Sequence, residues 1–430
     1  AVGTNEWVDE APFRFTFVRV AHSVPQATGV VFDTPEGLVV HSGDYKLDPT
    51  PIDGEPTDLG TFAGFARRGV RLLLADSTNA EIPGFIESEA SVGREIRDLV
   101  GRAEGRVILA CFASHIHRVQ QVIDAVVAEG RKFAFLGRSM LRNTEIARDL
   151  GLLDYPNEGL LAVDDLADLD PADTAIICTG SQGEPFAALS LMASGQHRQI
   201  KLAAGDTVII SATPIPGNET KVSRVINNLI GTGADVYHGR NTHVHVSGHA
   251  AQEEIKTFLN VVQPLAFVPV HGERRHLYAN GKLARQIGVG EVEVCVDGDV
   301  VVLEDGELRV ERSAIAAGYV YLDGVDIGDV EDVLRDRRHL ADDGVLIVTV
   351  GVDMGTGDLV IGPDVDSHGV RDDAEMIHKF VAEAVASAIA GLEFPADLDT
   401  VRRRVRNTAS RAVKKQLNSR PVVIPVVIEV

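Results

Sequence analysis

Three histidines in this chain each follow a short strand-like apolar run, and an aspartate closes the turn after one of them. His22, His41 and His271 stand at the ends of these runs, and Asp44 completes the sequence HSGD that begins at His41. Because a sheet fixes the backbone at a strand end, a side chain there can point into a cleft and bind a ligand. Imidazole nitrogens and carboxylates together suit zinc or manganese, and a carboxylate can bridge two ions. His22, Asp44 and His271 are therefore candidate metal ligands, whereas a single histidine at a strand end is more often structural.

A dense group of histidines lies between residues 241 and 249. Four polar side chains alternate along this segment: His243, His245, Ser247 and His249. In an extended strand all four would project from one face, just before a predicted helix that begins at Ala250. Three imidazoles and a hydroxyl at a helix N-terminus suit a phosphate, and Gly248 permits close approach of the backbone. The pattern favours phosphate binding over the alternative, an exposed polar strand face.

The elements that would position these residues follow from the periodicity of apolar side chains. The predicted strands span 14–20, 71–74, 107–112, 132–136, 174–178, 207–211, 265–270, 345–352 and 422–430, with a hairpin over 29–44. The predicted helices span 116–127, 222–229, 250–261, 372–390 and 401–417. Strands and helices alternate between residues 90 and 235, which predicts a parallel sheet with helices on both faces and ligands at the carboxyl ends of its strands.

Composition narrows the class of protein. With 45% hydrophobic and 24% charged residues among 430, the chain is typical of a globular protein of two or three domains. Its formal net charge of −22 argues against a surface that binds polyanions in general, although a local basic groove is compatible with it. Three distant cysteines, Cys111, Cys178 and Cys295, indicate no disulfide framework, and no apolar run reaches the ~18 residues of a membrane span. We therefore expect a cytoplasmic protein without membrane association.

Eight motifs, in an unchanged order over residues 15 to 300, are similar to those of the ribonuclease J family, which comprises β-CASP ribonucleases of the metallo-β-lactamase type. The motifs are HSVP at 22–25, HSGD at 41–44, DSTNAE at 76–81, FASHIHR at 112–118, TGSQGEP at 179–185, PIPGNE at 214–219, HVSGH at 245–249 and PVHGE at 269–273. The last residues, RPVVIPVVIEV at 420–430, resemble the end of that family's small C-terminal domain.

The resemblance implies an α/β fold in three parts. These are an αββα metallo-β-lactamase sandwich whose N-terminal part is missing from these residues, an inserted doubly wound β-CASP domain and a small α/β C-terminal domain. We expect the metallo-β-lactamase core at 1–89 and 236–310, the β-CASP domain at 90–235, a linker at 311–332 and the C-terminal domain at 333–430.

The resemblance also implies roles for individual residues. His22, Asp44 and His271 match metal ligands of the family, with Asp44 as the bridging carboxylate. Asp76 and His249 match its catalytic signature residues, and His249 would donate a proton to the leaving oxygen. Two segments would hold the RNA phosphate: Ala113, Ser114 and His115, and His245, Val246, Ser247, Gly248 and His249.

The activity that the resemblance implies is hydrolysis of RNA phosphodiester bonds with two divalent metal ions, zinc being expected and manganese or magnesium being the alternatives. Members of the family degrade RNA from a 5′-monophosphate end in the 5′-to-3′ direction, also cut internally, and act in mRNA decay and rRNA maturation. The expected partners are single-stranded 5′-monophosphorylated RNA, further copies in a homodimer or homotetramer, and an RNA-degradation complex.

One departure from the family keeps alternatives open. The family's first metal motif, H-x-H-x-D-H, is not found in these 430 residues, and we expect N-terminal residues that carry it in the complete protein. Without them the chain would be a catalytically inactive RNA-binding or scaffold subunit of a degradation complex. A DNA-processing β-CASP nuclease is a further alternative, which His249 and the C-terminal ending disfavour. A small-molecule hydrolase would not need the insertion at 90–235.

Overall fold

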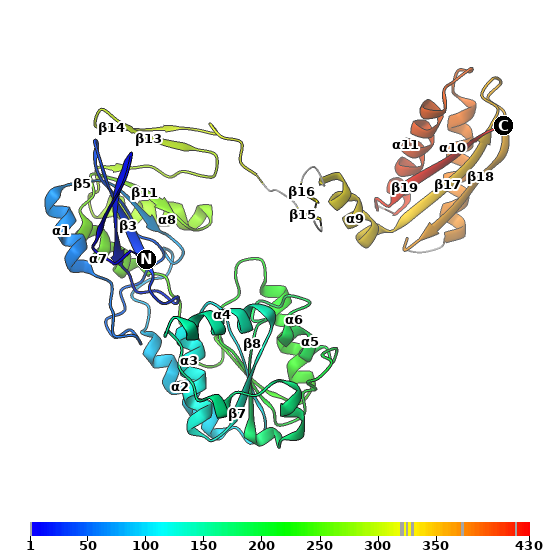
Figure 1. Cartoon of the computed structure of the whole chain (residues 1–430). Helices are drawn as coiled ribbons and strands as arrows, with labels where there is room; N and C mark the ends of the chain where they lie inside the picture. The colour runs from blue at the N-terminus through cyan, green and yellow to red at the C-terminus, as the bar shows by residue number, and fades with distance from the viewer. Residues whose placement is uncertain (1, 319–321, 324–325, 328–330, 371–373, 418) are drawn as a thin grey trace. The chain divides into compact units, whose positions relative to one another are not determined.

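The computed structural model describes the whole chain except residues 1, 319–321, 324–325, 328–330, 371–373 and 418 (Figure 1). Contacts divide the chain into two compact units, Ala1–Ala317 and Gly318–Val430. The linker expected at 311–332, and the first residues of the helix expected at 372–390, lie partly outside the described residues.

The first unit contains a seven-stranded sheet in the order β1-β2-β3-β4-β5-β11-β12. Its strands are β1 (Trp7–Glu10), β2 (Phe13–Arg19), β3 (Thr28–Thr34), β4 (Gly37–His41), β5 (Val70–Asp76), β11 (Ala266–Val270) and β12 (Glu291–Val292). Neighbours from β1 to β4 are antiparallel, whereas β4, β5, β11 and β12 run parallel to one another. The carboxyl ends of β4, β5 and β11 therefore lie side by side at one edge of the sheet.

Three helices cover one face of this sheet, α1 (Leu59–Arg68), α7 (Gln252–Val262) and α8 (Arg274–Gln286) (Figure 1). In α7 the buried apolar residues recur at helical spacing: Ile255, Phe258, Leu259 and Val262. This stripe packs against the apolar residues of β2 to β5 and β11, which fixes α7 and the segment that leads into it. On the other face, the hairpin of β13 (Val300–Glu304) and β14 (Glu307–Glu311) contributes Val301 and Leu308 to a smaller cluster.

A second, five-stranded sheet is inserted between β5 and α7, in the order β10-β9-β6-β8-β7, and all its strands are parallel. The strands are β6 (Val107–Ala110), β7 (Lys132–Leu136), β8 (Thr174–Cys178), β9 (Thr207–Ile210) and β10 (Asp235–His238). The helices are α2 (Glu89–Arg102), α3 (Ile116–Ala128), α4 (Arg138–Asp149), α5 (Ala188–Ala193) and α6 (Glu219–Gly231), with short 3-10 turns η1 (Asn157–Gly159), η2 (Asp164–Asp168) and η3 (Pro171–Asp173).

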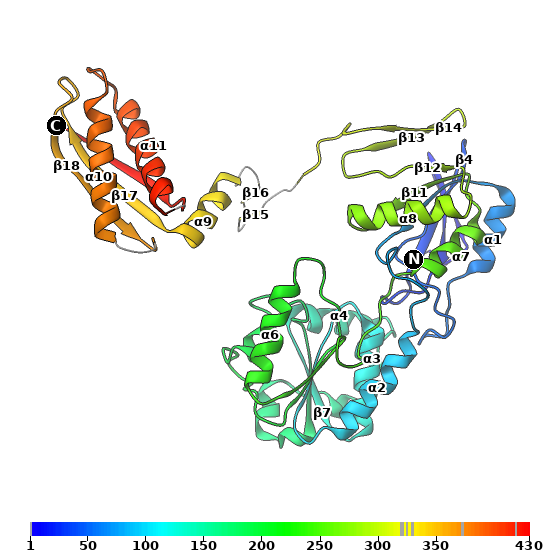
Figure 2. The same cartoon turned by 180° about the vertical axis from the view of Figure 1, so that it is seen from behind.

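Helices cover both faces of the inserted sheet (Figures 1 and 2). Val107 and Leu109 of β6 pack with α2, α3 and α4, whereas Ile108 and Ala110 pack with α5 and α6. Because successive side chains of a strand point to opposite faces, a strand buried on both sides is apolar throughout. The prediction of an α/β chain with a doubly wound insertion is confirmed.

The second unit has a three-stranded sheet in the order β18-β17-β19. Its elements are β15 (Leu322–Asp323), β16 (Asp326–Ile327), α9 (Glu331–Asp343), β17 (Val345–Val352), β18 (Leu359–His368), α10 (Ala374–Ala390), α11 (Leu398–Leu417) and β19 (Val422–Glu429). Helices α10 and α11 pack on one face, where Leu346, Val348 and Val350 are buried. The opposite face leaves Ile424, Val426 and Ile428 of β19 at 45%, 38% and 42% exposed.

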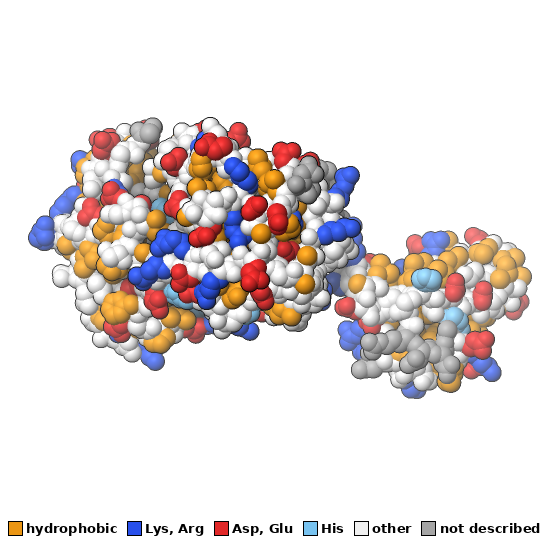
Figure 3. Space-filling model, turned by 90° about the horizontal axis from the view of Figure 1, so that it is seen from below, with side chains coloured by type: hydrophobic (Ala, Val, Ile, Leu, Met, Phe, Trp, Pro, Cys, Tyr) orange, Lys and Arg blue, Asp and Glu red, His pale blue; other side chains and the backbone are white. Residues whose placement is uncertain are grey.

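Acidic and basic side chains are interspersed over the larger unit on the face seen in Figure 3. In the described part of the chain, no helix is both long and apolar enough to cross a membrane.

Candidate active site

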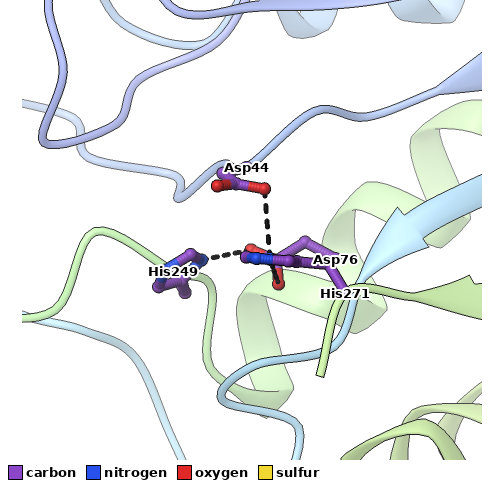
Figure 4. A group of neighbouring side chains, drawn as sticks. All are labelled: Asp44, Asp76, His249 and His271. Atoms are coloured by element: carbon purple, nitrogen blue, oxygen red, sulfur yellow. Dashed lines mark hydrogen bonds and ion pairs between the residues drawn. The ribbon is translucent and has the colours of Figure 1, made fainter. Parts of the chain in front are cut away.

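The parallel strands β4, β5 and β11 bring three predicted site residues to one sheet edge. Asp76 is the last residue of β5, His271 directly follows β11, and Asp44 lies in the loop after β4. His249 reaches the same place from the segment before α7 (Figure 4). One ligand atom from each of these four residues lies within 4.8 Å of the others. Side chains up to 227 positions apart in sequence (44 to 271) thus form one cluster of two carboxylates and two imidazoles.

Close contacts join the cluster. His249 Nδ1 lies 2.5 Å from Asp76 Oδ2, and His271 Nδ1 lies 3.1 Å from Asp44 Oδ1 and 3.3 Å from Asp76 Oδ1. His271 has a left-handed backbone with φ of 53°, a conformation that is uncommon outside glycine. The Asp76 carboxylate can accept the Nδ1 proton of His249, which leaves the Nε2 atom of that imidazole available.

His22, the third predicted metal ligand, lies at the rim of the cluster. Its Nε2 is 3.9 Å from Asp44 Oδ2, and its Nδ1 donates to the Gly248 carbonyl at 2.9 Å. A ring that donates from one nitrogen to a carbonyl keeps the lone pair of the other nitrogen for a metal. The structure therefore brings His22, Asp44, Asp76, His249 and His271 together.

The electrostatics of the cluster favour the ionised form of Asp76. Burial acts to raise the pKa of the Asp76 carboxyl, but hydrogen bonds from His249 and His271 outweigh it and hold this pKa well below its usual range. The hydrogen bond between His271 and Asp76 also raises the pKa of the His271 imidazole. Burial lowers the pKa of His22, which favours the neutral, metal-binding form of its imidazole.

The donor set fits a divalent cation. Zinc is bound by imidazole nitrogen and carboxylate oxygen at about 2.0–2.2 Å, so ligands of one ion lie ~4 Å or less from each other. The four ligand atoms, all within 4.8 Å, need only small side-chain rotations to meet this spacing. His22 adds a further nitrogen beside Asp44.

Several residues that support the cluster were not predicted. Asn79 Nδ2 donates to Ser247 Oγ at 2.9 Å and to the His249 carbonyl at 2.8 Å. Asn280, which is fully buried on α8, donates to the Asp76 carbonyl at 3.0 Å. Asn79 lies within the DSTNAE motif, which is a signal that could have identified it, whereas the sequence around Asn280 offers none.

The segment 241–249 forms no strand: it has a turn at 241, bends at 242 and at 248–249, and no regular structure between them. The expectation that it forms a strand is wrong, because its backbone groups bond to side chains instead of a neighbouring strand. The Val244 carbonyl accepts hydrogen bonds from Arg118 and Ser211, and Ser247 Oγ accepts from the amide of His249 at 3.2 Å. Its side chains also have different partners. His243 Nε2 lies 2.7 Å from Ser91 Oγ, whereas His249 belongs to the cluster around Asp76.

His245 has a buried ring nitrogen, Nδ1, without a hydrogen-bond partner among the residues that the structure describes. Burial, with the positive charge of Arg118, lowers the pKa of His245 to about 3, so the imidazole is neutral at physiological pH. Gly248 lies so close to His22 that a Cβ at this position would come within 2.7 Å of His22 Nδ1.

The predicted residues Ala113, Ser114 and His115 lie in the loop between β6 and α3. Ser114 is exposed, whereas His115 is only 2% exposed and caps the N-terminus of α3 by accepting from the amide of Arg118. Burial lowers the pKa of His115 to about 4. Its Nε2 lies 3.4 Å from Glu89 Oε1 but forms no hydrogen bond with it.

Three family models match separate parts of the chain. Residues 104–229 match "Ribonuclease J, beta-CASP domain", residues 234–295 match "Zn-dependent metallo-hydrolase RNA specificity domain", and residues 332–430 match "Ribonuclease J C-terminal domain". Together they account for most of the inserted sheet, the return to the first sheet and the second unit.

Curated relatives match over almost the whole chain. Ribonuclease J of Corynebacterium glutamicum is 43% identical over 98% of this chain, and the chain spans 59% of that protein. Ribonuclease J 1 of Streptococcus pyogenes is 39% identical over 96% of the chain, which spans 75% of that relative. Ribonuclease J2 of Bacillus subtilis is 36% identical over 97% of the chain, and the chain spans 76% of that relative.

A solved structure of a protein of unknown function from Enterococcus faecalis has a related fold. It superimposes with a TM-score of 0.51 at 16% sequence identity, covering 72% of this chain and 67% of that one. At this identity the likeness concerns the fold alone.

Proposed function

The chain belongs to the ribonuclease J family, and on that premise we propose that it is the hydrolytic part of a metal-dependent ribonuclease. The reaction is hydrolysis of RNA phosphodiester bonds in the 5′-to-3′ direction from a 5′-monophosphate end, with internal cleavage as a second mode. Its biological role is in mRNA decay and rRNA maturation.

The observation that carries the proposal is the cluster of Asp44, Asp76, His249 and His271 beside the segment 241–249. A metal-dependent phosphodiesterase needs metal ligands and a phosphate-binding segment close together, and this cluster and the segment beside it are candidates for both. The Gly248 carbonyl, which accepts from His22 at 2.9 Å, links the two directly.

We assign metal binding to His22, Asp44 and His271, with zinc as the expected ion and manganese or magnesium as alternatives. Bound divalent ions supply Lewis-acid activation of the phosphoryl oxygen and of the attacking water, and two-metal sites stabilise both the attacking and the leaving oxygen. Two ions need more ligands than these three residues, and Asp76 is the described carboxylate best placed to contribute.

His249 is assigned the proton transfer to the leaving oxygen. The Asp76 carboxylate, 2.5 Å from Nδ1, fixes the orientation of the imidazole. An aspartate that contacts Nδ1 in this way leaves Nε2 as the atom that exchanges the proton with RNA.

RNA phosphate binding is assigned to two groups of residues. His245, Val246, Ser247, Gly248 and His249 form one wall of the site, and Ala113, Ser114 and His115 form the opposite wall. His245 supports this assignment with its free Nδ1, and exposed Ser114 offers a hydroxyl. The ring of His115 is buried, so this residue supports the assignment indirectly, by capping the N-terminus of α3.

The test uses the full-length protein with zinc or manganese and a 5′-monophosphorylated single-stranded RNA. Wild-type protein should release nucleotides from the 5′ end, and His249→Ala should lower kcat by ~10²–10⁴-fold while RNA affinity changes little. Loss of RNA binding with normal cleavage per bound RNA would contradict the role of His249. RNA binding without hydrolysis by the metal-loaded wild type would favour a scaffold subunit, and cleavage of DNA alone would favour a DNA-processing nuclease.

We also propose that the second unit joins copies of the chain into a homodimer or homotetramer. The face of its sheet opposite α10 and α11 exposes Ile424, Val426 and Ile428, a row of apolar side chains that a second copy could cover. Such an assembly could take part in an RNA-degradation complex. We place it in the cytoplasm, where RNA decay and maturation occur.

A further inference from the structure

Arg118 is the largest side chain that is fully buried in the described residues, with 0% exposure. It lies in the first turn of α3, and a guanidinium carries five N–H donors that must find partners when buried. Its Nε donates to Glu89 Oε1 at 2.8 Å and to Gln121 Oε1 at 3.1 Å, and its Nη2 also donates to Glu89. Its Nη1 donates to Ser211 Oγ and, at 2.7 Å, to the Val244 carbonyl.

These partners come from different parts of the fold. Glu89 is the first residue of α2, Ser211 directly follows β9, and Val244 belongs to the segment 241–249. Ser211 Oγ donates to the same Val244 carbonyl at 2.8 Å, so this carbonyl accepts two hydrogen bonds from the inserted domain. The peptide unit that precedes His245 is therefore fixed from inside the protein.

The opposite end of the segment is fixed by the first sheet. Asn79 holds Ser247 and the His249 carbonyl, and Asp76 holds the His249 ring. Between the two attachments lies His245, whose buried Nδ1 is unpartnered within the described structure. A segment held at both ends with an unused nitrogen between them is preorganised for a ligand.

The network also continues toward the loop that carries Asp44. The backbone amide of Glu89 donates to Asp48 Oδ2 at 3.0 Å, and Lys46 Nζ lies 3.3 Å from the same carboxylate oxygen. Arg118 is thus connected through Glu89 and Asp48 to residues two to four positions after Asp44.

We propose that Arg118 is a positioning residue, whose buried guanidinium fixes the Val244 carbonyl and thereby holds the segment 241–249 in the conformation that binds the terminal phosphate of RNA. This inference rests on the proposed function, because it assigns the residue that prepares the same phosphate-binding segment. Arg118 itself does not contact RNA, since its side chain is fully enclosed.

The test compares the affinity of the full-length protein for two forms of one single-stranded oligonucleotide, with a 5′-monophosphate or a 5′-hydroxyl, in EDTA so that no hydrolysis occurs. The variants are Arg118→Lys, which keeps the charge but loses the planar fork, and Ser211→Ala, which removes one donor to the Val244 carbonyl and one acceptor of Arg118 but keeps the ion pair of Arg118 with Glu89. Arg131→Lys is the matched control, because Arg131 is also buried in the inserted domain and donates to the backbone carbonyls of Ala103 and Gly105.

We expect both test variants to lower the preference for the 5′-monophosphate by about tenfold, the equivalent of one hydrogen bond to a charged group. Affinity for the 5′-hydroxyl form should change less than about twofold, and Arg131→Lys should keep the wild-type preference. In the metal-loaded protein, Ser211→Ala should raise KM for the 5′-monophosphorylated RNA by the same factor and leave kcat within about twofold. Should Arg118→Lys fail to fold, Ser211→Ala still provides the measurement.

Equal loss of affinity for both RNAs, or an unchanged preference in Ser211→Ala, would overturn the proposal. A wild-type protein without any preference for the 5′-monophosphate would overturn it as well. The proposed function fails separately, if the wild-type protein prefers the 5′-monophosphate but does not hydrolyse RNA when loaded with metal.

Discussion

The buried pair of Glu89 and Arg118 leads to a prediction about stability that requires neither RNA nor metal. The substitution Glu89→Gln keeps the shape of the side chain but removes the carboxylate charge that Arg118 Nε and Nη2 contact. Glu89 is 7% exposed and Arg118 is 0% exposed, so solvent cannot replace the lost charge. We expect Glu89→Gln to destabilise the first unit strongly at neutral pH.

The magnitude follows from the pKa of Glu89. Burial acts to raise this pKa, but the contact with His115 and the positive charge of Arg118 outweigh it and lower it from 4.5 to about 2. At ~1.4 kcal/mol per pKa unit, the carboxylate form contributes roughly 3 kcal/mol to the free energy of unfolding at pH 7. Breaking a buried ion pair by removing one partner costs about 3–5 kcal/mol, a range that agrees with this estimate from the pKa of Glu89.

The sign of the pH dependence is fixed by the direction of this pKa change. A carboxyl group whose pKa is lower in the folded state stabilises the fold above its unfolded pKa, and the contribution is lost as the pH falls from 4.5 toward 2. At pH 3 it should be about 1.4 kcal/mol. The difference between wild type and Glu89→Gln should therefore shrink to about two fifths between pH 7 and pH 3.

Thermal unfolding followed by circular dichroism measures this difference. For a unit of this size, ~3 kcal/mol corresponds to a Tm about 6 °C lower in Glu89→Gln at pH 7, and the gap should be about 2 °C at pH 3. Glu253→Gln is the control, because Glu253 lies on the surface of α7 beside Lys256 and such pairs contribute little. A change below about 1 °C at pH 7, or an equal loss at pH 3, would refute the assignment of the pair.

Three further predictions concern metal binding and assembly. His271→Ala removes a nitrogen at the centre of the cluster, so the full-length protein should retain at least one zinc ion fewer per chain by atomic absorption, and unchanged zinc content would contradict the assignment. Gly248→Ala places a Cβ within 2.7 Å of His22 Nδ1 and should weaken zinc binding by ~10-fold or more, measured by competition with a chelator. The control is Gly231→Ala, which should bind zinc as wild type does because nothing lies within 4 Å of a Cβ at that position. Ile424→Glu charges the open face of β19 and should shift the protein to a smaller species in light scattering, whereas an unchanged mass would exclude this face from the interface.

The strands were the elements that sequence predicted best. The predicted bounds 132–136, 174–178 and 345–352 coincide with β7, β8 and β17, since uninterrupted apolar runs between polar residues suit buried strands. Helix α4 was missed because few of its residues face the core, namely Met140, Thr144 and Ala147. Its periodicity was therefore hidden among polar side chains.

The candidate site was predicted in part. His22, Asp44 and His271 stand out because they follow strand-like runs, and the structure gathers them with Asp76 and His249. Arg118 was not singled out for any role, because its partners are 29, 93 and 126 positions away in sequence. A buried charge is recognised only when the fold shows what encloses it.

The order in which the chain emerges during synthesis has a consequence for the sheet edge that carries the candidate ligands. Residues 72–76 of β5 pair with 266–270 of β11, but the whole inserted domain is made between them. At about 5–20 residues per second, the edge of β5 waits ~10–40 s for its partner, long enough for the inserted domain to fold first. The metal centre is thus completed only after the inserted domain has been made, and until then the free edge of β5 is open to misassociation in the nascent chain. A chaperone that covers this edge while residues 77–265 are made would protect the strand until Asp76 and His271 can meet.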